Sequence, residues 1–387
     1  MSTADDRCRR AGFTVLEAIV AVVVSVIVVI VAIPLLYRGT QALRRSGCAY
    51  NLRALGQALD AYQTAHSGAF PCGARYQMSP ESPWGPSWWT ELLPYVAQDG
   101  GKMHWEQVRC SGDFGGEEVN PNLKLVDGLL PTVMRCPASS LPPLSDPNKT
   151  YSQANRDSLD HPAKGVALPD YVALAGSAPD MMNIRPDQSV IGPHGRNTRD
   201  GPWGILSGSG AFPPNQAMRH ASLRDGVGNV IIVGEQSTWG IDPYYNPPLQ
   251  YDLRSSFPDG GYKGAGGNYG GLNPEAEGIN GSGDDRCFNI TTVRYAINAV
   301  TLDAEKLPKG IVANPIGPPP RLPRDKKPKN IPQHPTGPGH NHGIFSVHVG
   351  GANVLFGDGH VEFKSEQMDL PTLQMLVTRD DGHVAKK

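Results

Sequence analysis

The chain has 387 residues and a formal charge of −2, enough length for one large domain or two ordinary ones. Its 45 glycines and 36 prolines exceed the usual share of a globular protein, but they follow no G-X-Y period, so a collagen is excluded. Basic and acidic residues balance at 35 and 37. That balance argues against a general electrostatic hold on nucleic acid, and we expect no nucleic-acid partner.

The first predicted element is an apolar helix at residues 13–36, which carries no charge from Ala18 onward. A helix of this length extends roughly 36 Å, enough to cross a hydrocarbon core of about 30 Å. A secretory signal peptide fits poorly, because the apolar run is long and no small-x-small cleavage site follows it. No later segment is comparable. The sequence therefore predicts a single-pass protein whose remainder faces water.

Three features of this segment are unexpected for a simple anchor. Glu17 places a carboxylate near the bilayer core, at a cost on the order of 3 kcal/mol. Gly12 directly precedes Phe13, after a short polar leader with three arginines. Pro34 removes a helical hydrogen bond and should kink the helix. The string GFTVLE, with the later proline, resembles the class III signal of type IV pilins and type II secretion pseudopilins.

That resemblance implies that a prepilin peptidase removes residues 1–12 by cleavage between Gly12 and Phe13, and that Phe13 is then N-methylated. It also implies that Glu17 faces the N-terminal amine of a neighbouring subunit in a filament, so that two charges costly in lipid compensate each other. Pro34 matches a proline common in the family's helix. Arginines at both ends of the span leave its orientation undecided. The resemblance implies that the N-terminus is cytoplasmic and the head extracytoplasmic.

Residues 37–67 are predicted to continue the helix into water. One apolar stripe recurs at three- and four-residue spacings, formed by Leu43, Cys48, Leu52, Leu55, Leu59 and Tyr62. Ser67 and Gly68 supply a stop. The helix would then run from residue 13 to about 66, roughly 80 Å, and pack its second half against the head. Two separate helices, broken at Gly39 or Gly47, are the alternative.

Residues 68–387 are predicted to form a β-rich, extracytoplasmic head. The expected elements are a short surface helix at 87–98 that its proline ends, and strands at 133–137, 170–177 and 229–237. Two loop insertions are expected, one at about 241–285, rich in Gly, Asn, Pro and Tyr, and one at 306–338, rich in proline and lysine. The second should be extended and exposed.

The string at 343–363 predicts an antiparallel hairpin with Asp358 and Gly359 as its two-residue turn. This register would place four apolar residues on one buried face: Val354, Phe356, Val361 and Phe363. The other, mostly polar face would carry Leu355, His360 and Glu362. The sequence thus predicts a hairpin that is buried on one side only.

The same string carries a second resemblance. Nine residues separate His348 from Asp358 and Gly359, which resembles the H-x9-DG signature of the prepilin-type C-terminal region in the domain of unknown function 1559 family, abundant in planctomycetes. Further blocks agree in order: GCAYNLRALGQALDAYQTAHSGAFPCG, SWWTELLPYVAQ, MRCPASS, SLRDGVGNVIIVGE and LVTRDDGHV. Val349 and His360 depart from the family's usual Pro and Ser. The resemblance implies an α+β, pilin-like fold, with a long N-terminal helix packed on an antiparallel β-sheet head, and it implies no detailed activity.

Five cysteines remain once the leader with Cys8 is removed: Cys48, Cys72, Cys110, Cys136 and Cys287. Disulfides persist in an extracytoplasmic head. Cys48 and Cys136 fall in the blocks that match the family, so the resemblance favours that pair, which would stabilise the fold by about 3–4 kcal/mol. Cys72–Cys110 is then the expected second pair, and Cys287 is left over.

No motif for catalysis or cofactor binding is present, since the sequence lacks a nucleophile elbow, a P-loop, a dinucleotide fingerprint and HExxH. Five of the 11 histidines lie between residues 334 and 360, but His334, His340 and His342 fall in a Pro/Gly loop without ligand spacing. We expect His348 to hydrogen-bond the backbone near the hairpin turn, and Asp358 to be a turn residue. Residues 280–285 and 380–381 offer oxygen ligands for calcium, without EF-hand spacing. We expect no metal site, no cofactor and no enzymatic activity.

These observations predict a structural subunit of a type II secretion or type IV pilus-like filament in the inner membrane. Its expected partners are a prepilin peptidase, other pilin-like subunits and the secretion or pilus machinery. The residues that carry the prediction are Gly12 and Phe13 for processing, Glu17 and Pro34 for assembly, and His348, Asp358 and Gly359 for the head. The alternative is a membrane-anchored surface or binding protein that does not polymerise, because long Pro- and Gly-rich insertions are awkward for tight packing in a fibre.

Overall fold

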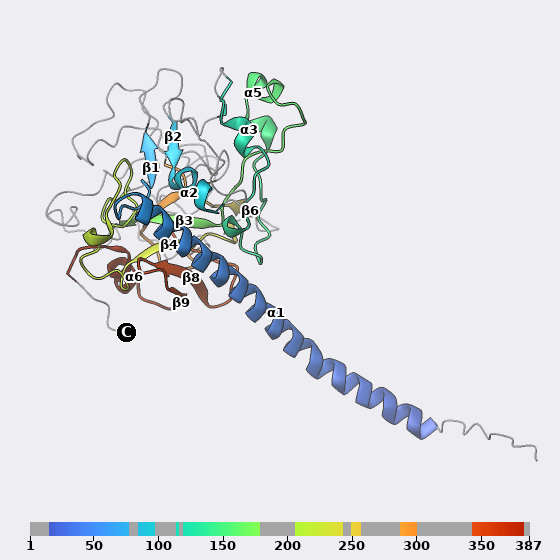
Figure 1. The fold of residues 1–387 in the computed structure, drawn as a ribbon. Coiled ribbons are helices and arrows are strands. Elements are labelled where there is room, and N and C mark those ends of the chain that lie inside the picture. The colour runs from blue at the N-terminus through green and yellow to red at the C-terminus, as the bar shows by residue number, and fades with distance from the viewer. Residues whose placement is uncertain are drawn as a thin grey trace, which may run out of the picture. The chain divides into compact units, whose positions relative to one another are not determined.

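The computed structural model describes residues 15–76, 84–96, 114–115, 119–178, 206–242, 249–256, 287–299 and 343–382 (Figure 1). The chain divides into two compact units, Met1–Ser46 and Gly47–Lys387. The predicted leader, Gly12, Phe13 and the insertion at 306–338 lie outside the described residues.

One helix, α1 (Val15–Ala65), runs through both units and is 51 residues long. The predicted continuous helix is therefore confirmed, and the alternative of a break at Gly39 or Gly47 is wrong. The helix also continues through Pro34. In the first unit, residues 15–31 are exposed, and Leu43 is 72% exposed. Leu43 was expected in the buried stripe, and this expectation is wrong.

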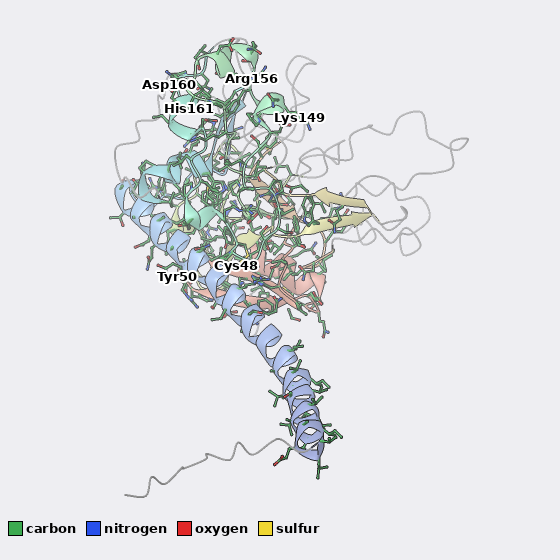
Figure 2. All side chains as sticks on the ribbon, turned by 90° about the vertical axis from the view of Figure 1, so that its right-hand side faces the viewer. Cys48, Tyr50, Lys149, Arg156, Asp160 and His161 are labelled. Carbon is green, nitrogen blue, oxygen red and sulfur yellow. A yellow bond between two sulfur atoms is a disulfide. The ribbon has the colours of Figure 1, made fainter. Side chains whose placement is uncertain are left out.

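The part of α1 in the second unit has one buried face. The large apolar side chains on this face are spaced by three and four positions and are at most 6% exposed: Cys48, Leu52, Leu55, Leu59 and Tyr62. Tyr50, between two of them, points outward, whereas Cys48 points into the head (Figure 2). The helix ends as predicted, because Ser67 and Gly68 have φ of 55° and 77°. The Gly68 N–H then donates to the Gln63 carbonyl at 2.8 Å, which closes the last turn.

The head is built on a five-stranded sheet in the order β7–β3–β4–β8–β9 (Figure 1). The strands are β3 (Tyr171–Ser177), β4 (Ile231–Glu235), β7 (Ile290–Val293), β8 (Gly351–Phe356) and β9 (Val361–Ser365). Four of them are antiparallel neighbours, but β7 lies parallel to β3. The prediction of a purely antiparallel sheet is therefore wrong. The long connection from β4 to β7 contains a separate antiparallel pair, β5 (Trp239–Asp242) and β6 (Leu249–Asp252). It carries the chain from β4 to the far side of β3, where β7 runs parallel to β3.

Both faces of this sheet are covered. Alternate side chains of β3 and β8 pack either with the α1 stripe, as Ala173 and Leu355 do, or on the opposite side, as Leu174 and Val354 do. On that opposite side lies α6 (Leu370–Val377), which contributes Leu373, Leu376 and Val377. Its first turn is capped by Asp369, whose side chain accepts the Thr372 N–H. Burial on both faces explains why these strands have nearly continuous apolar sequences.

The remaining elements of the head are short. They are β1 (Ala74–Tyr76), β2 (Trp84–Ser87), α2 (Trp88–Val96), α3 (Leu123–Val126), η2 (Thr132–Met134), α4 (Pro147–Thr150), α5 (Gln153–Asp157) and η3 (His220–Ser222). The segment around α4 and α5 carries the polar side chains of Lys149, Arg156, Asp160 and His161 (Figure 2). Turns and helix caps connect these short elements, as the high Gly and Pro content would suggest.

The predicted strands at 170–177 and 229–237 are confirmed as β3 and β4. Three other predicted elements of the head need correction. The helix predicted at 87–98 is present as α2, but it continues past Pro94 and its Trp88 and Trp89 are fully buried. It was expected on the surface; instead, the Trp88 indole N–H donates to the Asn289 carbonyl at 2.9 Å and both rings join the core.

The strand predicted at 133–137 is wrong, because a 3-10 turn occupies Thr132–Met134. Pro131 begins this turn, and the Met134 N–H returns to the Pro131 carbonyl at 2.9 Å. The insertion expected from residue 241 is also wrong in part. It contains β6, and just after β6 lies Arg254, which is 1% exposed. A buried charged residue in such a segment has no apolar pattern by which sequence could reveal it.

Candidate functional site

The N-terminal segment Val15–Ile33 has a mean hydropathy of 3.1 and is long enough to span a membrane or to serve as a signal sequence. Glu17 lies in the first turn of α1 and is exposed there. The expected processing residues, Gly12 and Phe13, lie outside the described residues, so this part of the candidate site is described only from Val15 onward.

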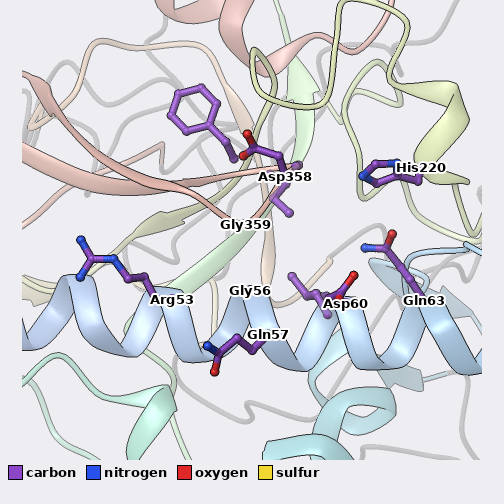
Figure 3. Close-up of a pocket in the computed structure, with 12 residues that line it drawn as sticks. Arg53, Gly56, Gln57, Asp60, Gln63, His220, Asp358 and Gly359 are labelled. Atoms are coloured by element: carbon purple, nitrogen blue, oxygen red, sulfur yellow. The ribbon is translucent and has the colours of Figure 1, made fainter.

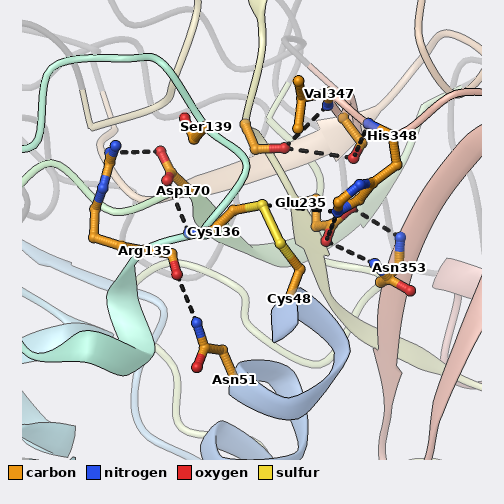
Figure 4. The surroundings of a disulfide bond; sticks show 12 residues. Cys48, Asn51, Arg135, Cys136, Ser139, Asp170, Glu235, Val347, His348 and Asn353 are labelled. Atoms are coloured by element: carbon orange, nitrogen blue, oxygen red, sulfur yellow. Dashed lines mark hydrogen bonds and ion pairs between the residues drawn. A yellow bond between two sulfur atoms is a disulfide. The ribbon is translucent and has the colours of Figure 1, made fainter. Parts of the chain in front are cut away.

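In the head, a disulfide attaches α1 to the rest of the unit. Cys48 and Cys136 are bonded, with their Cα atoms 5.0 Å apart, which confirms the pair that the family resemblance favoured. Both residues are buried. Asn51, one turn along the helix, donates its side-chain amide to the Arg135 carbonyl at 2.6 Å (Figure 4). The Asn51 amide also lies 3.3 Å from the Thr132 carbonyl, so the helix is held to the same short segment by a covalent bond and by hydrogen bonds.

His348 lies beside this disulfide. Its Nε2 is 3.7 Å from Cys136 Sγ and 3.6 Å from Glu235 Oε1 (Figure 4). Glu235, at the end of β4, is fully buried, and its carboxylate accepts the backbone N–H and the side-chain amide of Asn353, each at 2.9 Å. The cluster therefore joins a helix, two strands and a loop through buried polar groups.

The expectation that His348 hydrogen-bonds the backbone near the hairpin turn is wrong. Its ring faces Glu235 and the disulfide, and its own N–H donates to Ser346 Oγ at 3.1 Å. The six residues of β8 separate it from the turn, a distance of roughly 20 Å in an extended strand. His348 and the Asp-Gly pair thus occupy opposite ends of β8.

The turn after β8 has three residues instead of the predicted two. The Gly359 N–H donates to the Phe356 carbonyl at 3.0 Å, and the Phe356 N–H donates to the His360 carbonyl at 2.9 Å. Gly359 has φ of 87°, which suits a glycine in this bulged turn. Leu355 consequently pairs with Val361, one residue away from the predicted register. The predicted polar face is wrong too, because Leu355 is fully buried.

Asp358 is a turn residue, as expected. Its Oδ1 accepts the His360 N–H at 3.1 Å, and the His360 Nδ1 lies 2.5 Å from the same oxygen. Partial burial acts to raise the pKa of Asp358, but the hydrogen bonds from His360 outweigh it and hold the pKa below its ordinary value. Asp358 therefore stays charged and fixes the turn.

The turn lies against α1 at Gly56. A Cβ on Gly56 would come within 3.1 Å of Leu355 Cδ1 and 3.3 Å of Gly359 Cα. Beside this contact is a groove of about 330 Å³ (Figure 3). Its polar lining comes from α1 and from the head: Arg53, Gln57, Asp60, Gln63, His220 and Asp358. The H-x9-DG string thus reaches one helix at two places, through the disulfide at Cys48 and through the turn at Gly56.

A buried charge network that sequence analysis did not single out supports the segment around Cys136. Asp170 accepts the Cys136 N–H at 3.0 Å, and its other oxygen lies 2.8 Å from Arg135 and 3.0 Å from Arg254. Arg254 also pairs with Asp252 at 2.6 Å. Burial raises the pKa of Asp170 to about 6, although both arginines act to lower it.

Two other cysteines in the described residues are buried thiols, Cys72 and Cys287. The predicted Cys72–Cys110 disulfide includes Cys110, which lies outside the described residues. The Sγ of Cys72 lies 3.7 Å from the Ala74 carbonyl, and burial raises the pKa of Cys72 to about 11. A thiol with this pKa is protonated and unreactive at neutral pH.

The residues considered as calcium or histidine ligands are mostly outside the described part of the chain, including 280–285 and the histidines at 334, 340 and 342. In the described part, Asp380 lies 3.6 Å from Arg379, and the Asp381 N–H donates to Asp225 at 2.8 Å. The 380–381 pair thus takes part in contacts within the protein at the C-terminal end of the head.

These features define an α+β protein with one N-terminal helix apolar enough to span a membrane. Residues 39–371 match the model of a family described as a protein of unknown function (DUF1559), and the chain belongs to that family. No curated protein and no solved structure matches it. The match begins after the apolar segment and the GFTVLE string, so it identifies the head and the second half of α1 but does not bear on the pilin-type signal.

Proposed function

We propose that this protein is a structural, pseudopilin-like subunit of a type II secretion or type IV pilus-like filament. It is processed by a prepilin peptidase and anchored in the inner membrane, with its N-terminus cytoplasmic and its head extracytoplasmic. The observation that carries the proposal is Glu17 in the first turn of an apolar, exposed helical segment, as the fifth residue after the Gly12–Phe13 junction. The role is structural, with no cofactor and no enzymatic activity.

The physical argument rests on what must cover this segment. An exposed apolar helix needs lipid or other helices around it, and a carboxylate within it needs a positive partner. Cleavage before Phe13 would create an α-amine at the start of the segment. In an assembly, the amine of one subunit and Glu17 of another can compensate each other.

The Cys48–Cys136 bond supports the proposed location of the head. Disulfides persist in oxidising compartments and are rare in the cytosol. The bond also fastens α1 covalently to the head, so that force applied along the helix would reach the head without depending on apolar packing alone.

Processing is tested by mass spectrometry of the mature N-terminus. We expect the membrane-inserted chain to begin at Phe13, N-methylated, and Gly12→Val to block cleavage because a branched side chain does not fit a site shaped for glycine. Ala11→Val, one residue earlier, is the matched control and should still be cleaved. Recovery of residues 1–12 on the inserted wild-type chain would refute prepilin-type processing.

Assembly is tested by crosslinking between subunits in membranes. Glu17→Ala should insert normally and be cleaved, because it removes a charge that is costly in lipid, yet it should lose crosslinks to other pilin-like subunits. Ser25→Ala is the control: Ser25 is polar and in the same segment, but its hydroxyl bonds the Ala21 carbonyl of its own helix at 2.7 Å. Equal crosslinking of Glu17→Ala and wild type would contradict the filament role.

That last outcome would favour a second candidate, a membrane-anchored surface or binding protein that does not polymerise. The polar groove between α1 and the hairpin turn supports this candidate, because its volume of about 330 Å³ is within the range of small-molecule sites. In that case Arg53→Ala, within the groove, would impair function, whereas Glu17→Ala would not.

A further inference from the structure

Four side chains at the helix attachment bring their donor atoms together in one buried place. Cys48, Cys136, Glu235 and His348 each offer one atom, and these atoms all lie within 4.8 Å of one another. They come from α1, the segment after η2, the end of β4 and the loop before β8 (Figure 4). None is more than 3% exposed. The disulfide uses only two of the four, so it does not explain why a histidine and a glutamate face it.

We propose that the reduced form of this cluster binds one Zn²⁺, with Cys48 Sγ, Cys136 Sγ, His348 Nε2 and a Glu235 carboxylate oxygen as its four ligands. Two thiolates, one imidazole and one carboxylate are ligand types that Zn²⁺ takes in tetrahedral sites. The soft thiolates disfavour Mg²⁺ and Ca²⁺. Nε2 already faces both Cys136 Sγ, at 3.7 Å, and Glu235 Oε1, at 3.6 Å, so no ring rotation is required.

The charge of the site suits the ion. Two thiolates and one carboxylate carry three negative charges, and Zn²⁺ would leave one, the same balance as in a structural site of three cysteines and one histidine. The groups behind the ligands are also in place, since Asn353 orients the Glu235 carboxylate with two hydrogen bonds of 2.9 Å. Such supporting hydrogen bonds are a regular feature of metal sites.

The change between the two forms balances chemically. A dithiol or phosphine reductant supplies two electrons to the Cys48–Cys136 bond and is itself oxidised, while two protons from solvent complete the two thiols. Zn²⁺ then displaces both thiol protons to solvent and takes the thiolates. Reoxidation needs a disulfide oxidant, which takes two electrons from the two thiolates and, with two protons from solvent, leaves as a dithiol, while the Cys48–Cys136 bond re-forms and the ion is released.

The consequence is that α1 remains attached to the head in either redox state, by a sulfur–sulfur bond when oxidised and by the ion when reduced. The site would let a newly made head fold before its disulfide forms. This inference does not depend on a filament role, because it concerns only the second unit of the chain.

The test uses the full chain in detergent, unfolded with urea and a phosphine and refolded without oxygen in the presence of Zn²⁺. Native mass spectrometry gives the number of ions bound, and Co²⁺ in place of Zn²⁺ gives absorption bands that report tetrahedral geometry and thiolate ligation. The same measurements are made on His348→Ala, Glu235→Gln and Cys48→Ser. His360→Ala is the matched control, since His360 is also paired with carboxylates, Asp358 and Glu362, but is partly exposed on the hairpin.

We expect one Zn²⁺ per reduced chain, none at this site in the oxidised chain, and thiolate–cobalt bands only in the reduced form. Loss of a supporting residue weakens metal sites about 10- to 100-fold, so loss of the His348 ligand should weaken binding at least about 100-fold, while His360→Ala should bind like wild type. A reduced wild-type chain that takes no Zn²⁺ would overturn the proposal. So would equal affinity in wild type, His348→Ala and Glu235→Gln, because unfolded thiols would bind without regard to either residue.

Discussion

The two halves of α1 differ in what their apolar residues meet. In Val15–Ile33, apolar side chains lie on all sides of the helix and are exposed. From Cys48 to Tyr62, the large apolar side chains form one stripe, which is buried in the head, and the exposed positions include the polar Arg53, Gln57 and Asp60. The second half is therefore covered by its own chain, whereas the apolar side chains of the first half remain exposed. Predictions that separate the two halves test this difference.

The largest expected effect comes from the bond that fastens only the second half. The double variant Cys48→Ser with Cys136→Ser should lose about 3–4 kcal/mol of unfolding free energy, because the bond closes a long loop in the unfolded chain, with its ends separated by 88 positions in sequence. Urea unfolding followed by the fluorescence of buried Trp88 and Trp89 measures this loss. Reduced wild type, with a chelator present, is the control and should match the variant. A variant as stable as oxidised wild type would show that the disulfide does not stabilise the fold.

A leucine from each half gives the next largest contrast. Leu52→Ala should cost about 2–5 kcal/mol, because it opens a cavity in a closely packed core, where Leu52 is 0% exposed. Leu43→Ala should change stability by less than about 0.5 kcal/mol, since Leu43 is 72% exposed. The same fluorescence measurement checks both. Equal losses would mean that the stripe extends into the first half after all.

Two glycines of α1 sharpen the comparison further. Gly56→Val should cost about 1–3 kcal/mol, because its side chain would overpack the contact with the hairpin turn, where Leu355 and Gly359 lie within 3.1 and 3.3 Å of an added Cβ. Gly39→Val is the control, because nothing lies within 4 Å of its Cβ position. Thermal unfolding measures the stability of both variants. Equal unfolding temperatures would contradict the close contact at Gly56.

The smallest effect concerns Asp170, which supports the disulfide by accepting the N–H of Cys136. Because the pKa of Asp170 is raised in the fold to about 6 from 3.8, the folded chain holds this proton more tightly than the unfolded chain does. Its contribution to stability is therefore present below about pH 4 and is lost as pH rises through 6. Asp170→Asn cannot titrate, so the difference in unfolding free energy between variant and wild type should change over this window. A constant difference from pH 4 to 7 would show that the arginines hold the carboxyl ionised throughout.

Sequence alone determined the elements whose pattern is local. The apolar run, the three- and four-residue spacing of the stripe and the Ser67–Gly68 stop each depend on neighbours within a few residues, and α1 has these features. The β-branched runs of β3 and β4 were recognised for the same reason. The Cys48–Cys136 pair was predicted only because the family resemblance aligned blocks far apart in the chain.

Tertiary structure decided the rest, because the causes lie far away in sequence. At the hairpin turn, Gly357 lies against Leu223, whose Cδ2 would be 2.6 Å from an added Cβ. The burial of Trp88 depends on Asn289. His348 has its partners in Glu235 and the disulfide instead of the turn nearest to it in sequence. A buried polar group takes whichever partner the packed fold brings within hydrogen-bond distance, and spacing along the chain does not contain that information.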